Sequence, residues 1–185
     1  ALRTGPVLLS ILGVTALTNF FHFSYFPIVP VIAERVGAGS FRAGFLAAAT
    51  GFGMAIGSTF VLVANPRRGR AYVLGSAGAF VLLNGFALFD RYVPVYLALL
   101  AASAFVGVFG ATQSALVMTA AAASMRGRAM GMLSMAIGCL PLGMYALGEL
   151  AEVLGAPAAL VVANVVGLVG LGLFLVWRPQ VLQVR

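Results

Sequence analysis

Residues 41–70 read FRAGFLAAATGFGMAIGSTFVLVANPRRGR, an apolar run that stops at an Asn-Pro pair and a cluster of arginines. About 20 apolar residues are enough for a helix to cross about 30 Å of hydrocarbon. Pro66 lacks a backbone N–H and disfavours helix at the residue before it, so the helix is expected to end at 64. The stretch therefore predicts a transmembrane helix over 41–64, followed by an arginine-rich turn.

The alternation of long apolar runs with short charged breaks continues through the whole chain. Hydrophobic residues make up 62% of the 185 and charged residues only 8%, which leaves too little polar surface for a water-soluble fold. Helices satisfy their own backbone hydrogen bonds in hydrocarbon, so an all-α, polytopic membrane protein is predicted. A single transmembrane domain is expected, with six spans over about 7–33, 41–64, 71–89, 93–123, 129–150 and 158–177.

The distribution of charge predicts how the spans cross the membrane. Breaks that hold only arginine, at 67–70 and 126–128 and near both chain ends, alternate with breaks that hold all four acidic residues. Arginine-rich loops remain on the cytoplasmic side, so both termini are expected in the cytoplasm. The net charge of +7 does not indicate nucleic acid, because no basic stripe with interleaved aromatics is present. Membrane lipids are the expected partners of these arginines.

The first span carries a polar stripe in an otherwise apolar helix. Thr15, Thr18, Asn19, His22 and Tyr25 recur at helical spacings of three, four and seven, which places them on one face. Ionisable and polar groups inside a membrane are costly and are candidates for function. Such a stripe needs a wet cavity or polar partners on another helix. As the sole histidine, His22 is a candidate for proton coupling, and the alternative is a hydrogen-bonded packing residue.

Aromatic side chains crowd the same span between 20 and 26. They predict a site for lipophilic or cationic ligands, bound by apolar contact and cation–π attraction, with Tyr25 and Phe26 best placed. Packing against lipid and neighbouring helices is the alternative. Pro27 and Pro30 are expected to kink this span. The polar candidates for a substrate pathway elsewhere are Thr50 in span two, Gln113 in span four, and Ser134 and Tyr145 in span five.

Small residues are spaced for close contact between helices. Gly53 and Gly57 form a GxxxG pair in span two, and such faces let transmembrane backbones approach each other. A compact helix bundle is therefore expected. Further residues assigned to helix packing are Gly107 and Gly110 in span four, and Gly138, Pro141 and Gly143 in span five.

The sequence holds no set of residues typical of an enzyme. His22 is the sole histidine, and neither Ser10 nor Ser24 beside it lies in a Gly-x-Ser-x-Gly frame. The four acids lie near the breaks and far apart in sequence, so no metal site is expected. A phosphate-binding loop is also missing. No enzymatic activity, cofactor or metal is therefore predicted.

Two arginine motifs resemble cytoplasmic loops of the major facilitator superfamily. The stretch from 126 to 131, with the glycines and proline that follow it, resembles the loop between helices ten and eleven and helix eleven itself. Within the superfamily it most resembles bacterial drug and siderophore exporters. The stretch 65–70 resembles the second-half copy of the Asp-Arg-x-Gly-Arg-Arg loop, with Pro66 in place of the aspartate. The motif residues are Arg67, Arg68, Gly69, Arg70, Arg126, Gly127 and Arg128, and the glycines and proline are Gly138, Pro141, Gly143 and Gly148.

The resemblance implies that the six spans are helices seven to twelve, half of a twelve-helix fold built as a 3+3 inverted repeat. On that alignment the chain, which begins at Ala1, is expected to be a fragment that lacks the N-terminal half. In this family, helices matching spans one and four line the cavity, two and five line its sides and the interface, and three and six lie outside.

The resemblance further implies alternating access in a bacterial inner membrane, with efflux of lipophilic or amphipathic small molecules. Proton coupling would come through the missing N-terminal half, and the isolated chain is not expected to transport. The alternatives are a non-transporting six-span scaffold or assembly subunit, and a homodimeric half-transporter.

Overall fold

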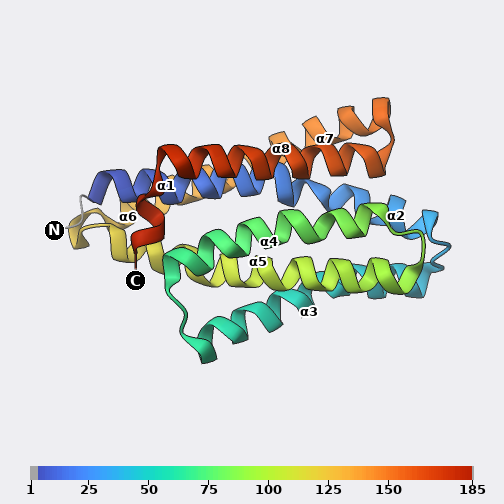
Figure 1. Cartoon of the computed structure of the whole chain (residues 1–185), viewed down its shortest axis with the longest axis horizontal. Helices are drawn as coiled ribbons and strands as arrows, with labels where there is room; N and C mark the ends of the chain where they lie inside the picture. The colour runs from blue at the N-terminus through green and yellow to red at the C-terminus, as the bar shows by residue number, and fades with distance from the viewer. Residues whose placement is uncertain (1–3, 185) are drawn as a thin grey trace.

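A computed structural model of the chain describes residues 4–184 (Figure 1). Within that range the protein is all-α and contains no strand. Six helical stretches are long and apolar enough to cross a membrane, which confirms the predicted fold class. The chain is therefore an integral membrane protein. The spans are Gly5–Arg35, Ser40–Ala64, Arg68–Leu88, Tyr92–Ala120, Ala123–Leu154 and Ala156–Trp177.

Every span begins earlier than expected, and spans three and five do so by three residues or more, so the arginine motifs do not lie wholly in loops. Helix α4 (Arg68–Leu88) starts inside the first motif, and residues 68–70 form its first turn. Helix α6 (Arg126–Ile137) likewise starts at the second motif, so that 126–128 are helical. Arginine is a good helix former, and its long side chain can extend toward the interface from a helix end. Arg3 and Arg185 lie outside the described residues.

The first span is interrupted over eleven residues, and the interruption begins upstream of its prolines. Helix α1 (Thr4–Leu17) is followed by the π-helical segment η1 (Thr18–His22), the 3-10 segment η2 (Phe23–Ile28) and the short helix α2 (Val29–Arg35). The expected kink at Pro27 and Pro30 is thus only the second part of the distortion. Hydrogen bonds from polar side chains to carbonyls four residues back, which bend helices, occur at its first part.

The fifth span is also interrupted, at Gly138 and Cys139 between α6 and helix α7 (Leu140–Leu154). Pro141 is exposed in the first turn of α7, where a helix has no acceptor for the N–H that proline lacks. Gly143 lies against the backbone of Phe20 in η1, so closely that a Cβ there would collide with the Phe20 carbonyl. The two interrupted spans therefore meet at their distorted regions.

The remaining spans are continuous helices: α3 (Ser40–Ala64), α4, α5 (Tyr92–Ala120) and α8 (Ala156–Trp177). The GxxxG pair of α3 crosses α5, because a Cβ at Gly53 or Gly57 would collide with the backbone between 100 and 108. Gly107 completes the crossing from α5 against Met54. At Gly110 an added Cβ would meet nothing within 4 Å, so the described chain does not require a glycine at this position.

The six spans form two layers. Helices α4 and α8 pack against each other and lie in front of the other four spans in Figure 1. Behind them the order across the second layer is α3, α5, span one and span five, since each packs against the next. No described element covers the outer face of this second layer.

The contacts between spans follow a repeating order. Span one packs against span five, as span four packs against span two. Span six packs against span one, as span three packs against span four. These contacts are therefore conserved when spans one, two and three are replaced by spans four, five and six, in that order, and the reverse. One pair departs from the order: α7 packs along α8, whereas α3 diverges from α4.

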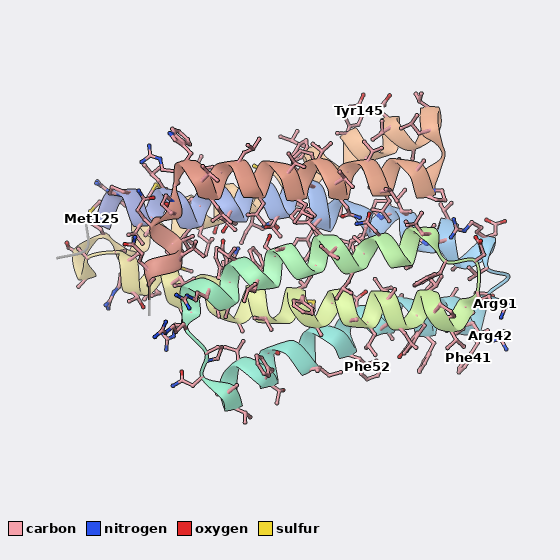
Figure 2. The ribbon with its side chains drawn as sticks, viewed as in Figure 1. Phe41, Arg42, Phe52, Arg91, Met125 and Tyr145 are labelled. Atoms are coloured by element: carbon pink, nitrogen blue, oxygen red, sulfur yellow. The ribbon has the colours of Figure 1, made fainter. Side chains whose placement is uncertain are left out.

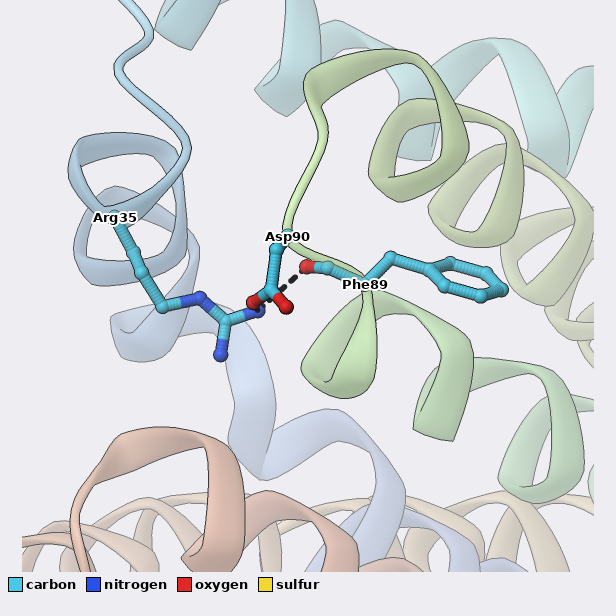
Figure 3. A network of polar contacts seen from close by, with 3 residues as sticks. All are labelled: Arg35, Phe89 and Asp90. Atoms are coloured by element: carbon cyan, nitrogen blue, oxygen red, sulfur yellow. Dashed lines mark hydrogen bonds and ion pairs between the residues drawn. The ribbon is translucent and has the colours of Figure 1, made fainter.

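The two ends of the bundle differ in charge. The end that holds the first and last described residues, with the α3–α4 and α5–α6 turns, carries six described arginines and no acid (Figure 1). The opposite end carries all four acidic residues and three arginines, among them Arg42 and Arg91 (Figure 2). There the Nη2 of Arg35 donates to the Phe89 carbonyl at 2.6 Å and lies 3.8 Å from Asp90 Oδ1 (Figure 3). This contact ties α2 to the turn between α4 and α5.

The end of the described chain folds back onto the arginine-rich end of the bundle. The 3-10 segment η4 (Pro179–Gln183) lies against α1 and α4. The N–H of Gly69 donates to the Val184 carbonyl at 3.1 Å, which satisfies one of the free donors at the start of α4. Gly69 permits this approach, because a Cβ there would collide with the Val181 carbonyl.

Candidate functional site

The polar stripe of the first span faces α4 and α5, and its side chains there, except that of His22, form hydrogen bonds. Gln113 Nε2 donates to Thr15 Oγ1 at 3.0 Å, Thr15 Oγ1 lies 2.6 Å from Tyr72 OH, and Tyr72 OH donates to the Ile11 carbonyl at 2.9 Å. An amide N–H can only donate and a carbonyl can only accept. These three bonds form a chain of hydrogen bonds, here called a relay. Its direction follows: Gln113 donates to Thr15, Thr15 to Tyr72, and Tyr72 to the Ile11 carbonyl.

A second relay runs beside the first. Thr18 Oγ1 donates to the Val14 carbonyl at 2.8 Å, so its single proton is used. Ser76 Oγ, 2.6 Å from Thr18 Oγ1, must therefore be the donor in that contact. Asn19 Nδ2 donates to the Thr15 carbonyl at 2.9 Å. The relays link three helices, and the stripe finds polar partners instead of a wet cavity.

Two members of these relays, Tyr72 and Ser76, were not among the residues singled out from the sequence. They belong to span three, which the resemblance places outside the cavity, and both are fully buried. Tyr72 also stacks on Phe109, with ring centroids 4.7 Å apart. Their spacing of four residues puts them on one helical face, the same signal that identified the stripe in span one.

His22 lies inside a cage of aromatic rings and is 1% exposed. The ring centroids of Phe23, Tyr25 and Phe80 lie 5.4, 5.5 and 5.6 Å from that of His22, all in edge-on arrangements. Its Nδ1 has no hydrogen-bond partner among the described residues. The sequence left open a hydrogen-bonded packing histidine, and at Nδ1 this bond is missing.

Asn164 of α8 is the second buried polar side chain in this region without a partner in the described chain. It is fully buried, and neither Nδ2 nor Oδ1 is bonded. Gly167, three positions further along α8, packs against the same Phe80 ring that contacts His22. A buried unpaired polar group costs about 1–3 kcal/mol and is uncommon in native proteins. His22 and Asn164 are therefore candidates for a role beyond packing.

Tyr25 and Phe26 diverge although they are neighbours in sequence. Tyr25 is buried, with its OH 3.4 Å from Oγ1 of the half-buried Thr50. Phe26 is 37% exposed and lies at 4.7 Å from Tyr25 and 5.9 Å from Phe23 between ring centroids. The aromatic run thus divides into a buried part that packs and an exposed edge formed by Phe26.

The two candidates of span five lie apart from the relays. Ser134 is exposed and bonds only to the Met130 carbonyl of its own helix, at 3.2 Å. Tyr145 is 71% exposed and points away from the bundle (Figure 2). Of the nine pathway candidates, the structure gathers Thr15, Asn19, His22, Tyr25 and Gln113 in the buried core, leaves Thr50 half-buried, and exposes Phe26, Ser134 and Tyr145.

Ligand-binding chemistry of other kinds has little support in the described part of the chain. No group of three or more His, Cys, Asp or Glu side chains in residues 4–184 could hold a metal ion. The hollows at the protein surface are mainly apolar or lined by arginine.

Comparison with known proteins leaves the family of the chain unassigned: no family model matches it, and no curated protein is similar to it at a significant level.

Proposed function

We propose that the chain is the C-terminal six-helix half of a secondary transporter of the major facilitator type. The observation that carries this proposal is the repeating order of contacts between spans one to three and spans four to six. Two such units, three spans apart, cross the membrane in opposite directions. Inverted repeats of this kind are the architecture on which transporters build alternating access.

The charge difference between the two ends supports an orientation. The end with six described arginines and no acid would face the cytoplasm, together with both chain termini. A bacterial inner membrane is the compartment that we propose, following the resemblance to bacterial exporters.

A missing partner is supported by the surfaces that remain uncovered. In the most apolar 18-residue window of each span, the buried share is only 22% for α3 and 17% for span five. The corresponding share is 50% for span one and 56% for α4. These two spans form the two edges of the uncovered layer, where the family places the contact between halves. An N-terminal six-helix half is the proposed partner of this face.

The substrate is proposed to bind between the halves, on the same uncovered layer. Exposed Phe26 and half-buried Phe23 offer apolar and cation–π contacts, and exposed Gly110 and Ser114 leave room on α5. No charged side chain is near these positions in sequence. We therefore propose efflux of lipophilic or amphipathic small molecules, with proton coupling through the missing half.

A dye-efflux assay tests the proposal in cells that express the full open reading frame containing this segment. We expect efflux above an empty vector, and about a tenfold loss when Phe26→Ala removes one aromatic contact. Phe89→Ala, at the exposed turn between α4 and α5, is the matched control and should retain efflux. Wild-type efflux equal to the vector, at normal membrane expression, would contradict an exporter.

The sealed relays favour one second candidate, a six-span scaffold or assembly subunit without transport. The hydrogen bonds from the polar stripe to α4 and α5 stabilise the bundle. This structural role accounts for the stripe without a transported substrate. An uptake assay in liposomes that contain only the 185-residue chain distinguishes such a scaffold from a homodimeric half-transporter. We expect no uptake in either direction, whereas uptake abolished by His22→Ala would identify a transporter that is complete in this chain.

A further inference from the structure

A groove lies between α3, α4 and α5 at the arginine-rich end of the bundle. Its cavity volume is about 630 Å³, within the range of about 300–1,000 Å³ that small-molecule sites occupy. Apolar side chains from all three helices line it, among them Ile56, Phe60, Leu74 and Phe105. Arg67 and Arg70 lie at the same groove. Figure 1 shows the cause, since α3 diverges from α4 and α5 toward its C-terminal end.

The groove occupies the place where the repeating order of contacts is broken. In the other three-span unit, α7 packs along α8 and leaves a hollow of only about 220 Å³ with no charged residue in its lining. Here the glycines of α3 hold it to α5 at the crossing, and beyond Gly57 the helix diverges. Asn65, with a left-handed φ of 42°, turns the chain, and the extended Arg67 returns it to α4.

The arginines of the groove have no acidic partner in the described chain. The sole ion pair within residues 4–184 joins Arg35 to Asp90 at the opposite end. Arg67 and Arg70 also line a polar hollow with the backbone segment 182–184, and Arg67 lines another with Asn65 and Arg68. The apolar groove thus ends at two guanidinium groups, those of Arg67 and Arg70, which have no acidic partner in the described chain.

We propose that this groove binds one anionic phospholipid from the surrounding membrane. An acyl chain lies against Ile56, Phe60 and Leu74, while Arg67 and Arg70 hold the phosphate. Guanidinium groups bind phosphate oxygens through paired hydrogen bonds, which favours an anionic headgroup over a zwitterionic one that also brings a cation. The site is distinct from the proposed substrate site, because its lining includes none of the residues placed there, namely Phe23, Phe26, Gly110 and Ser114.

Tryptophan quenching by brominated lipids tests the proposal in the full protein. The single Trp177 is changed to Phe, and Leu74→Trp places a probe in the groove. Nanodiscs of phosphatidylcholine receive a small fraction of either brominated phosphatidylglycerol or brominated phosphatidylcholine. We expect the anionic lipid to quench at a much lower fraction. Arg67→Gln and Arg70→Gln should each weaken its apparent affinity about fivefold.

Matched variants separate this site from general attraction of anionic lipid to a basic surface. Arg126→Gln and Arg128→Gln remove arginines at the same end but outside the groove, and quenching of the Leu74→Trp probe should be unchanged. A Val166→Trp probe in the smaller hollow beside α7 should respond equally to both lipids. A Phe60→Trp probe, from the α3 side, repeats the measurement if Leu74→Trp does not fold.

The other outcomes overturn the proposal. Equal quenching of Leu74→Trp by both lipids would mean ordinary annular lipid. Preference for the anionic lipid that survives both groove substitutions would mean a diffuse surface charge. An absence of quenching by either lipid would mean that a protein segment covers the groove.

Discussion

The continuous helices α3, α4 and α5 contrast with the interrupted spans one and five. The first three run 25, 21 and 29 residues without a break, although α3 holds a GxxxG pair. Span one changes from α to π to 3-10 geometry, and span five stops and restarts at Gly138. The interrupted spans also pack against each other, at Gly143 and Phe20. The bundle thus combines a rigid group of three helices with a pair that has built-in bending points.

The difference lies in how each group satisfies its backbone. A continuous helix bonds every interior N–H to a carbonyl four residues back, and only a costly change bends it. In span one, π and 3-10 turns already replace part of that ladder, and side-chain hydroxyls and amides bond to carbonyls such as those of Val14 and Thr15. Motion between two halves of a transporter would therefore bend spans one and five before it bends α5.

The largest loss of stability is expected from a substitution at the contact between α3 and α5, where both helices are continuous. Gly57→Val forces a side chain against the Ala104 carbonyl of α5, and neither helix has a distorted segment that can move. Overpacking of this kind costs about 3 kcal/mol or more when the backbone cannot relax. Denaturant unfolding in mixed micelles should show this loss, together with a lower yield of monodisperse protein. A smaller loss of unfolding free energy than that caused by Gly143→Val would contradict the interpretation of α3, α4 and α5 as a rigid group.

A smaller loss is expected from Gly143→Val, because its neighbour Phe20 lies in the π-helical segment and can shift. We expect about 1–2 kcal/mol in the same unfolding assay. Gly148→Val is the control in the same helix, since an added Cβ there meets nothing within 4 Å. Its stability should stay within about 0.5 kcal/mol of the original, as for ordinary surface positions.

The relays should contribute less than the close contacts. Thr15→Val and Tyr72→Phe each remove one hydroxyl from the seam between α1 and α4, at an expected cost of about 1 kcal/mol. A double-mutant cycle should give a coupling of about 0.6 kcal/mol, typical of hydrogen bonds between transmembrane helices. The matched pair Ser58→Ala and Thr119→Val removes exposed hydroxyls that bond within their own helices, and should show no coupling.

The smallest effects are expected at the acidic end. Asp90 is 87% exposed, so Asp90→Asn should change the unfolding free energy by less than about 0.5 kcal/mol. Arg35→Gln should cost more, about 1 kcal/mol, since Arg35 also donates to the Phe89 carbonyl at 2.6 Å. Raising the salt concentration should remove the Asp90 effect and leave most of the Arg35 effect. Equal costs would mean that the ion pair, not the carbonyl bond, ties α2 to the turn.

The sequence predicted the spans well because each depends on local composition. Length, hydropathy and the prolines and arginines at the breaks define six helices without reference to their neighbours. The contact of Gly57 with α5 is a similar case, since a small-residue face only needs some helix to approach it. Backbone distortion over 18–28 was predicted only at its prolines, because the side-chain bonds that accompany its start are visible only in three dimensions.

The partners of the polar stripe could not be predicted in the same way. Which helix faces Thr15 depends on the order of spans within the layers, and the sequence alone does not contain distances between spans. Tyr72 and Ser76 carried a usable signal in their spacing, but the resemblance assigned span three to the outside. The burial of five pathway candidates, and the exposure of Tyr145, follow from that packing order.

Both relays end at amide oxygens of α1, those of Ile11 and Val14. A water chain can pass a proton onward because every member both accepts and releases one, whereas an amide oxygen accepts a hydrogen bond and has no proton to release. Gln113, at the other end of the longer relay, gives up no proton either. A Grotthuss hop that entered at Thr15 would therefore stop within two steps. As bonded, the two relays therefore offer no continuous path for a proton along the contact between α1 and α4.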